Sequence, residues 1–423
     1  MGTITKLQND YNTNNQFGIF ADCNNLTKVV LPETLITIGA ITFIGCTSLT
    51  DINLDHVVTF DRYAFGSCTS LSLNDLTLTN AQTIHPGAFA NVPLTGTLSC
   101  PSLTSLPGEE YSMGAFENTN LTEIADLGSI TTIPDVRENA ATGCFANNQN
   151  LIKVTLPETL TFIGRRAFYN CPKLTTCSIP SSVTTINNSA FANTSLLFDE
   201  LNLPNLTTLN QNAFYGLKIK KLVLGALTTL PTANLNVQNY GDKSVLEEVV
   251  IPEGLTTIPD YSFNGYTSLA NINLDNITTI KNYAFGESGL GGILSAPNLT
   301  GILQMGAFYK TNIEEVADLG TITLIQNYTN ATGGVFAYCT QLKKVTLPST
   351  LEQIGNYTFY ECSALATVIC EATTPPIISS STFPSTMTAI YVPDASVDAY
   401  KAASGWSNAS LVNLIKPMSQ YNE

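Results

Sequence analysis

The stretch Leu151–Leu174 reads LIKVTLPETLTFIGRRAFYNCPKL and holds one full copy of a unit that recurs along the chain. Its apolar residues form two short runs separated by Pro157, and an Ala-Phe pair at 167–168 closes the unit after a Gly turn. The same order of residue types appears at 26–49 and at 342–365. Internal repeats with a period of about 20–50 residues are typical of solenoids. The stretch therefore predicts a solenoid in which each unit packs only on its neighbours.

A phenylalanine closes almost every unit, and most steps between these anchors are 22–24 residues. The step from Phe214 to Phe263 is about twice as long, and Tyr240 is the expected substitute anchor within it. This spacing gives about 16 units, and we expect the rings to be stacked inside one core. The anchors are Phe20, Phe43, Phe65, Phe89, Phe116, Phe145, Phe168, Phe191, Phe214, Phe263, Phe285, Phe308, Phe336, Phe359 and Phe383.

Two apolar runs in each unit predict two strands. The first run, L-x-x-I/V-x-L as at 151–156, alternates apolar and polar residues at its end, which indicates a strand with one buried face. A proline often follows and ends the strand, because it cannot donate to a ladder. A second run of the type T-T-I follows at 131–133, 184–186, 256–258 and 278–280. We therefore predict a mainly β, right-handed solenoid with two parallel sheets.

The two ends differ from the repeats. Residues 1–19 hold a short strand at 4–7 and a polar linker at 8–16, and the solenoid proper is expected at 20–383. The segment 384–423 is expected to form a helical cap.

The expected cap helix has recognisable end signals. Asp394 or Ser396 is a suitable N-cap, and Gly405 is suitable for ending the helix. Trp406 would then cover the open end of the core. The helix residues expected to face inward are Val397 and Tyr400.

Four units are longer than the others at one place, between the second strand and the anchor. These stretches are 106–116, 133–145, 230–240 and 325–336. Insertions at one repeat position emerge on one edge of a solenoid, and that edge often binds a partner. Tolerated loops without a role are the alternative, because extra loop length costs little entropy.

The repeated motif L-P-x-x-L-x-x-I-G-x-x-A-F-x-x-C-x-x-L resembles the BspA-like leucine-rich repeat family of bacterial surface proteins. The tail IYVPDASVDAYKAASGW at 390–406 is similar to the closing segment of its members. The resemblance implies a leucine-rich repeat solenoid on the cell surface or secreted, involved in adhesion. No export signal is visible after Met1, so extracellular localisation is implied by the resemblance alone, with the signal presumed removed.

The ten cysteines favour buried free thiols. Six lie three residues after an anchor, where other units carry Asn, Thr or Ser, so a column of small buried residues explains them. Disulfides and a metal site remain alternatives. Metal is the weaker of the two, because the sequence has no C-x-x-C pair and only His56 and His85. The six cysteines are Cys23, Cys46, Cys68, Cys171, Cys339 and Cys362.

The composition excludes several classes of function. Lys and Arg number 18 against 33 Asp and Glu, and the net charge of −15 argues against nucleic acid and anionic membranes as partners. No apolar run approaches the ~20 residues of a membrane helix. The sequence lacks a G-x-S-x-G nucleophile context and a phosphate-binding loop. We expect no enzymatic activity, no cofactor and no metal.

Candidate binding residues lie where the first strand of each unit points outward, since these positions vary while the inward ones stay apolar. We predict partner contacts there and at Tyr328 in the last long loop; the set is Asp51, Glu123, Lys153, Lys221, Glu248, Asn271, Glu315, Lys344 and Tyr328. Tyrosine also recurs beside the anchors, and partly buried rings on the coil edge are the alternative to a contact surface. These tyrosines are Tyr63, Tyr169, Tyr215, Tyr261, Tyr283, Tyr309, Tyr357 and Tyr360.

Three functional hypotheses follow. The first is a non-catalytic, monomeric binding protein that engages an extracellular protein or glycan, such as host matrix or other cells. The second is a structural spacer for another domain. The third is an enzyme with its site in the long loops, which a deep pocket lined by two carboxylates would favour.

Overall fold

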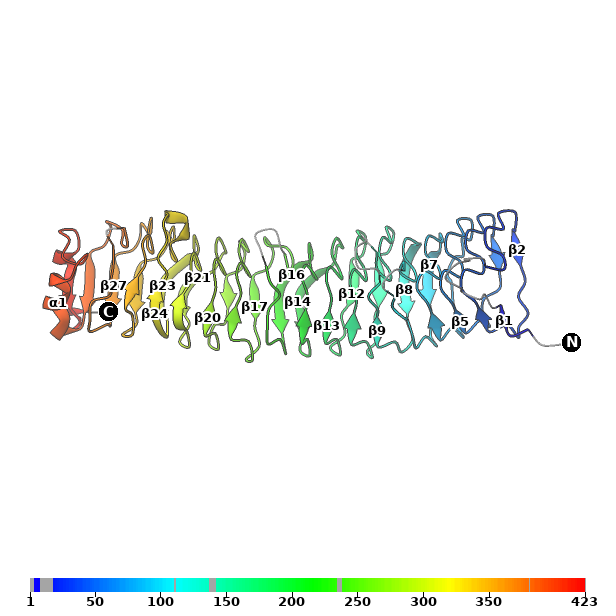
Figure 1. Cartoon of the computed structure of the whole chain (residues 1–423), viewed down its shortest axis with the longest axis horizontal. Helices are drawn as coiled ribbons and strands as arrows, with labels where there is room; N and C mark the ends of the chain where they lie inside the picture. The colour runs from blue at the N-terminus through cyan, green and yellow to red at the C-terminus, as the bar shows by residue number, and fades with distance from the viewer. Residues whose placement is uncertain are drawn as a thin grey trace. The chain divides into compact units, whose positions relative to one another are not determined.

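The computed structural model describes residues 4–7, 18–109, 112–136, 142–233, 238–379 and 381–422. The chain divides into two compact units, Met1–Ile219 with Gln238–Gly241 and Lys220–Val237 with Asp242–Glu423. Within each unit, successive coils add parallel strands one after another (Figure 1). The predicted mainly β solenoid of about 16 turns is confirmed. The polar linker predicted at 8–16 lies outside the described residues.

Each coil of the first unit contributes to two rows of strands. The first row consists of β2 (Lys28–Val29), β4 (Asp51–Ile52), β7 (Thr95–Ser99), β8 (Asn120–Asp126), β10 (Lys153–Thr155), β12 (Thr176–Ser178) and β14 (Leu197–Leu203). The second row consists of β1 (Lys6–Leu7), β3 (Thr37–Ile38), β5 (Thr59–Phe60), β6 (Thr83–Ile84), β9 (Thr132–Ile133), β11 (Phe162–Ile163), β13 (Thr185–Ile186) and β15 (Thr208–Leu209).

The second unit repeats this arrangement. Its first row consists of β16 (Lys218–Leu224, from Lys220 onward), β17 (Glu248–Val250), β19 (Asn271–Ile272), β21 (Gly291–Ser295), β23 (Asn312–Asp318), β25 (Lys344–Leu347), β27 (Thr367–Cys370), β28 (Ala389–Val392) and β29 (Ile415–Pro417). Its second row consists of β18 (Thr257–Ile258), β20 (Thr279–Ile280), β22 (Thr300–Leu303), β24 (Thr321–Ile325) and β26 (Gln353–Ile354). The short helices are α1 (Val397–Ala402) and the 3-10 turns η1 (Ala331–Gly333), η2 (Asp394–Ser396), η3 (Val412–Leu414) and η4 (Met418–Gln420).

Register in the second row follows from the T-T-I pattern. Ile163 of β11 aligns with Ile133 of β9 on one side and with Ile186 of β13 on the other. All three isoleucines are fully buried, while the residue before each is partly exposed. A slip by one residue would expose this entire apolar column, so the register is strongly specified.

The anchor phenylalanines form a stacked column in each unit. In the first unit the rings from Phe20 to Phe214 succeed one another at centroid separations of 5.2–6.5 Å. In the second unit, Phe263 to Phe383 do so at 5.3–5.6 Å. Tyr240 is completely buried, as expected of a substitute anchor. The prediction of stacked aromatic anchors is thus confirmed within each unit.

The turn that carries each anchor has an unusual backbone. Arg166 (φ 52°) and Asn170 (φ 57°), two residues before and after Phe168, are both left-handed, and most anchors are flanked in this way. The amides of Arg166, Phe168 and Asn170 donate to carbonyls of the next coil, at Asn188, Ala190 and Ala192. Left-handed conformation costs a non-glycine residue roughly 1–2 kcal/mol. The inter-coil hydrogen bonds offset this cost, because they leave none of these three buried amides without an acceptor.

The cysteines three residues after the anchors are hydrogen-bond donors. The thiol of Cys68 donates to the Phe43 carbonyl of the preceding coil (3.0 Å), and Cys362 donates likewise to Phe336 (3.1 Å). In another coil the side chain of Asn148 donates to the Phe116 carbonyl (2.9 Å). Thr194 donates instead to the carbonyl of its own anchor, Phe191 (2.9 Å), and the buried Ser288 hydroxyl has no hydrogen-bond partner among the described residues. This position therefore takes small side chains, of which Cys and Asn bond to the preceding coil.

All ten cysteines are free thiols in the structure, and nine are buried. Burial raises the pKa of the thiols, to about 12 for Cys68, Cys144, Cys171 and Cys177. Cys23 alone is partly exposed. Because the reactive form is the thiolate, the buried thiols should be inert in the folded protein.

The C-terminal cap closes the second unit's column largely as predicted. Trp406 is buried 5.7 Å from the Phe383 centroid, and its indole nitrogen donates to the Pro376 carbonyl (2.7 Å). Tyr400 packs edge-on against Trp406 at 4.9 Å. Val397 is only partly buried.

The predicted N-cap position is confirmed, whereas the predicted end of the helix at Gly405 is wrong. Ser396 stands at the N-cap, but its hydroxyl donates to the Thr373 carbonyl and makes no cap bond. Asp394 instead accepts from the Ser419 amide. The helix ends at Ala402, before Gly405, because the chain turns there to bring Trp406 onto the core.

Replacing one anchor should destabilise the protein strongly. Phe168 is fully buried between Phe145 and Phe191, each 5.4 Å away. We expect Phe168→Ala to lower the free energy of unfolding by about 3–5 kcal/mol, measured by urea denaturation. The matched control is Phe162→Ala, since Phe162 is only partly buried on β11. Equal losses for the two variants would contradict the role of the column.

Thiol titration should separate the folded from the unfolded chain. Without reductant, we expect DTNB at pH 8 to modify no more than Cys23 in the native protein and all ten cysteines after unfolding in guanidinium. The readout is the absorbance of the released thiolate. Fewer than ten thiols after unfolding would show that some cysteines are oxidised. Rapid native modification of several would show that the coil interior is open.

Candidate binding surfaces

The outward residues of the first row, predicted as partner contacts, are paired with one another. Their signs alternate because parallel register places the charged residues of neighbouring coils side by side, as Glu315 of β23 and Lys344 of β25 are. The ion pairs are Lys28–Asp51 (2.5 Å), Lys153–Glu123 (2.8 Å), Lys221–Glu248 (3.4 Å) and Lys344–Glu315 (3.0 Å). Exposed pairs of this kind contribute about 0–1 kcal/mol each. The variation in sign thus has a structural cause, yet a partner could break these pairs at little cost.

Lys344 contacts Tyr421 of the C-terminal cap in addition to its ion-pair partner Glu315. Its ammonium lies 5.5 Å from the centroid of the Tyr421 ring, and hydrogen bonds to Tyr421 and Glu315 raise its pKa. The C-terminal cap therefore reaches the first-row face and orients a predicted contact residue. No repeat pattern signals this contact, because Tyr421 follows the last repeat.

An uncharged break lies within the first-row face of the second unit. The ladder from β16 ends at β19, whose Asn271 aligns with Glu248, and a new sheet starts at β21. On β21 the outward Ile293 is 68% exposed and aligns with Glu315 of β23. A shallow hollow lined by Glu248 and Asn271 lies on β17 and β19. An exposed apolar side chain thus lies between two ion pairs. Glu315–Lys344 begins on the next coil, and Lys221–Glu248 lies beyond the coil of Asn271.

Six tyrosines follow one another along the anchor-turn edge of the second unit. We call Tyr261, Tyr283, Tyr309, Tyr338, Tyr357 and Tyr360 the tyrosine ladder. Adjacent rings lie 5.4–6.2 Å apart between centroids, over five successive coils. All six side chains are partly exposed. Sequence reasoning identified five of them and missed Tyr338, which lies two residues after its anchor.

One long loop packs on this ladder. The hydroxyl of Tyr283 donates to the Thr332 carbonyl (2.9 Å) in η1, two coils further on. The ring crosses Gly306, where a Cβ would come within 2.4 Å of it, so only glycine leaves the path open. The predicted contact residue Tyr328 packs on Gly333 in the same loop. The loop at 325–336 is therefore attached to the edge, and Tyr328 joins the tyrosines there.

In the first unit, a tyrosine hydroxyl likewise bonds to a long loop, the loop 106–116. The Met113 amide donates to the hydroxyl of Tyr63 (2.8 Å), whose ring crosses Gly87. Arg62 beside it pairs with Glu109 of the loop. In the loop 133–145, Asp135 accepts from the side chain of Asn187, two coils away. The reading of these two loops as insertions without a structural role is wrong for their described parts, whereas the centres of loops 133–145 and 230–240 lie outside the described residues.

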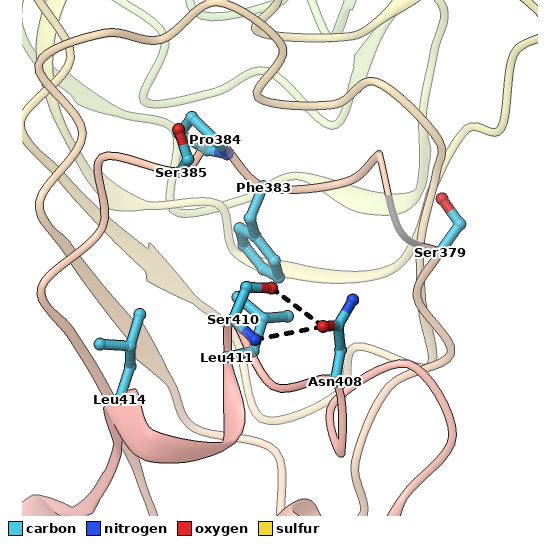
Figure 2. Close-up of a pocket in the computed structure, with 8 residues that line it drawn as sticks. All are labelled: Ser379, Phe383, Pro384, Ser385, Asn408, Ser410, Leu411 and Leu414. Atoms are coloured by element: carbon cyan, nitrogen blue, oxygen red, sulfur yellow. Dashed lines mark hydrogen bonds between the residues drawn. The ribbon is translucent and has the colours of Figure 1, made fainter.

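A small cavity lies beneath the C-terminal cap (Figure 2). Phe383, Leu411 and Leu414 form its apolar wall, and the side-chain carbonyl of Asn408 accepts from the amide and hydroxyl of Ser410. The remaining lining is Ser379, Pro384 and Ser385. These side chains include no group that titrates near neutral pH, so the lining offers no acid or base for catalysis.

Other chemistry was sought across the parts of the chain that the structure describes. No three His, Cys, Asp or Glu side chains among them gather as a metal ion would require. Nor does any helix in these ranges have the length and apolar character to cross a membrane. The exposed first-row face and the tyrosine edge are therefore the surfaces on which we base a function.

Solved structures similar to this chain include leucine-rich repeat proteins. A leucine-rich repeat protein from Bacteroides ovatus shares 22% identity, with 83% of this chain and 80% of that chain covered and a TM-score of 0.53. A leucine-rich cell surface protein from Faecalibacterium prausnitzii shares 20% identity over 98% of this chain and 88% of that one, with a TM-score of 0.28. The first likeness supports the fold. No curated protein sequence matches the chain.

The sequence profile of the BspA type leucine-rich repeat region matches residues 12–112, 109–236, 228–333 and 301–403. These ranges take in nearly all of the coils described above. Within the matched ranges lie the stacked phenylalanines, the T-T-I strands and the small residues that follow the anchors. The chain belongs to the BspA-type leucine-rich repeat family.

Proposed function

We propose that this protein is a non-catalytic binding protein, exported to the cell surface or secreted, that mediates adhesion as a monomer. Its partner is an extracellular protein or glycan, bound on the exposed surface of the coils. The three-part division into 1–19, 20–383 and 384–423 is part of this proposal, with the binding surface in the middle part.

The observation that carries the proposal is the exposed Ile293 between two ion pairs. Protein interfaces combine an apolar centre with a polar rim, and their affinity resides in a few central side chains. Ile293 supplies such a centre, while Lys221–Glu248 and Glu315–Lys344 supply the rim. Asn271 adds an exposed amide at the hollow between them. The predicted first-row contact residues of the second unit thus lie before and after one exposed apolar side chain along the same face.

Family membership supports the location, since similar solved proteins include one described as a cell surface protein. The spacer and enzyme hypotheses have weaker support. A spacer needs no exposed apolar side chain between ordered ion pairs. An enzyme site in the loops needs paired carboxylates in a pocket, but Glu109 and Asp135 are engaged by Arg62 and Asn187 instead.

The test is a binding screen of the full chain, by surface plasmon resonance, against immobilised fibronectin, laminin, fibrinogen, collagen and mucin. For a partner bound by the native protein, we expect Ile293→Asp to weaken binding by about tenfold or more, because it places a charge at the apolar centre. Ile377→Asp is the matched control, since Ile377 is 69% exposed but pairs with the second row at Gln353.

The outcomes of this test are distinct. Loss of binding in the Ile293 variant alone supports the proposal that the partner binds the first-row face. Equal loss in both variants, or in neither, contradicts it. Absence of binding to the whole panel counts against an adhesive role. Circular dichroism melting of each variant shows whether the fold is retained.

A further inference from the structure

The first unit has no continuous tyrosine ladder: Tyr63, Tyr169 and Tyr215 stand at equivalent positions, but on coils that do not adjoin one another. There, the positions two residues after successive anchors carry asparagines, and their side chains bond from coil to coil. Asn118 donates to Asn91 (2.7 Å), and Asn170 donates to Asn147 (2.9 Å). These residues share the left-handed backbone of Tyr338. At the position of Tyr338 the fold thus accommodates a small polar side chain, and the tyrosine there is not needed for the fold.

The ladder is held rigid before any ligand arrives. Each ring packs on the next, edge to face along Tyr283, Tyr309, Tyr338 and Tyr360 at interplanar angles of 72–78°. Tyr283 is also fixed to the loop through Thr332. Little side-chain entropy remains to be lost on binding, which raises the affinity that a given contact area can supply.

The hydroxyls of Tyr283, Tyr309 and Tyr360 remain protonated at neutral pH. Burial raises the pKa of Tyr283 and Tyr309, and the neighbouring charge of Glu361 raises that of Tyr360. The edge therefore presents partly exposed rings together with O–H groups that both donate and accept. Aromatic rings that carry hydroxyl groups can bind ligands that have an apolar face and hydroxyl groups around it.

We propose that the tyrosine ladder binds a linear, neutral polysaccharide along its length. This inference rests on the proposed binding function and adds to it the ligand class and the site. Sugar rings present C–H faces for stacking and hydroxyls for hydrogen bonds. A polysaccharide also repeats at the length of one ring, and the ladder presents one or more tyrosines on every coil. A folded protein surface has no such repeat.

Charge along the edge selects against acidic chains. Glu287 is exposed beside Tyr309 and pairs with Lys310 (3.3 Å), whereas Glu361 is exposed beside Tyr360. The Glu361 carboxylate would repel an anionic polysaccharide, whereas a neutral one meets only polar groups. Tyr328 on the adjoining loop lies close enough for its charge to affect the pKa of Tyr283, and it extends the same surface.

The experiment is native affinity electrophoresis of the full chain in gels that contain hydroxyethylcellulose, α-mannan or galactomannan, with alginate as the anionic comparison. The test variant is Tyr309→Ala with Tyr338→Asn. Both replacements occur naturally at the equivalent positions of the first unit, as Ala146 and Asn147 show beside Phe145. The variant should therefore fold, and an unchanged melting temperature checks that it does.

We expect at least one neutral polysaccharide to retard the native protein. The double variant should bind the same polysaccharide at least about tenfold more weakly. Tyr215→Ala is the matched control, because Tyr215 follows its anchor as Tyr309 does but lies in the first unit and is exposed. It should bind as the native protein does.

Three results would overturn the proposal: no retardation by any of the three neutral gels, retardation by alginate alone, or equal binding by the double variant and the native protein. If the tyrosine ladder binds no neutral polysaccharide but Ile293→Asp still abolishes binding to a matrix protein, the proposed function stands and only the polysaccharide site is refuted. If both fail, the binding function itself is refuted.

Discussion

The stacking of one phenylalanine per coil is the constraint on which the rest of the structure depends. Each ring lies between its neighbours at separations close to 5.5 Å, so the anchor must recur at the same place in every coil. That demand fixes the inward positions of both strand rows. It also brings the anchor turns of successive coils into contact, where their amides and carbonyls bond to one another. The left-handed residues beside each anchor are tolerated because these bonds require them.

Once the core is specified in this way, the outward positions are free to differ. The first-row face carries ion pairs in both units, and in the second unit the exposed Ile293 lies between two of them. The anchor-turn edge carries an asparagine ladder in one unit and a tyrosine ladder in the other. A repeat array can therefore acquire distinct binding surfaces on equivalent backbone positions without a change of fold.

The predictions from sequence succeeded where a single repeat position has a single physical role. The anchors, the T-T-I strands and the buried cysteine column were all found from spacing alone. They failed where a residue's partner comes from another coil. Lys221 and Glu248 look like independent contact residues in the sequence, yet they pair with each other. Tyr63 and Tyr283 look like isolated tyrosines, yet each crosses a glycine to hold a loop two coils away.

The sequence by itself determined the repeat length, the two strand rows, the aromatic core and the family, because these depend on contacts that every unit repeats with its neighbour. The tertiary structure alone decided which outward side chains meet, since parallel register and loop attachment join residues separated by one or two coils. It showed that a cysteine or asparagine three residues after an anchor can donate to the anchor carbonyl of the preceding coil. It also gathered six scattered tyrosines into one continuous surface, because the anchor turns that carry them are stacked coil upon coil.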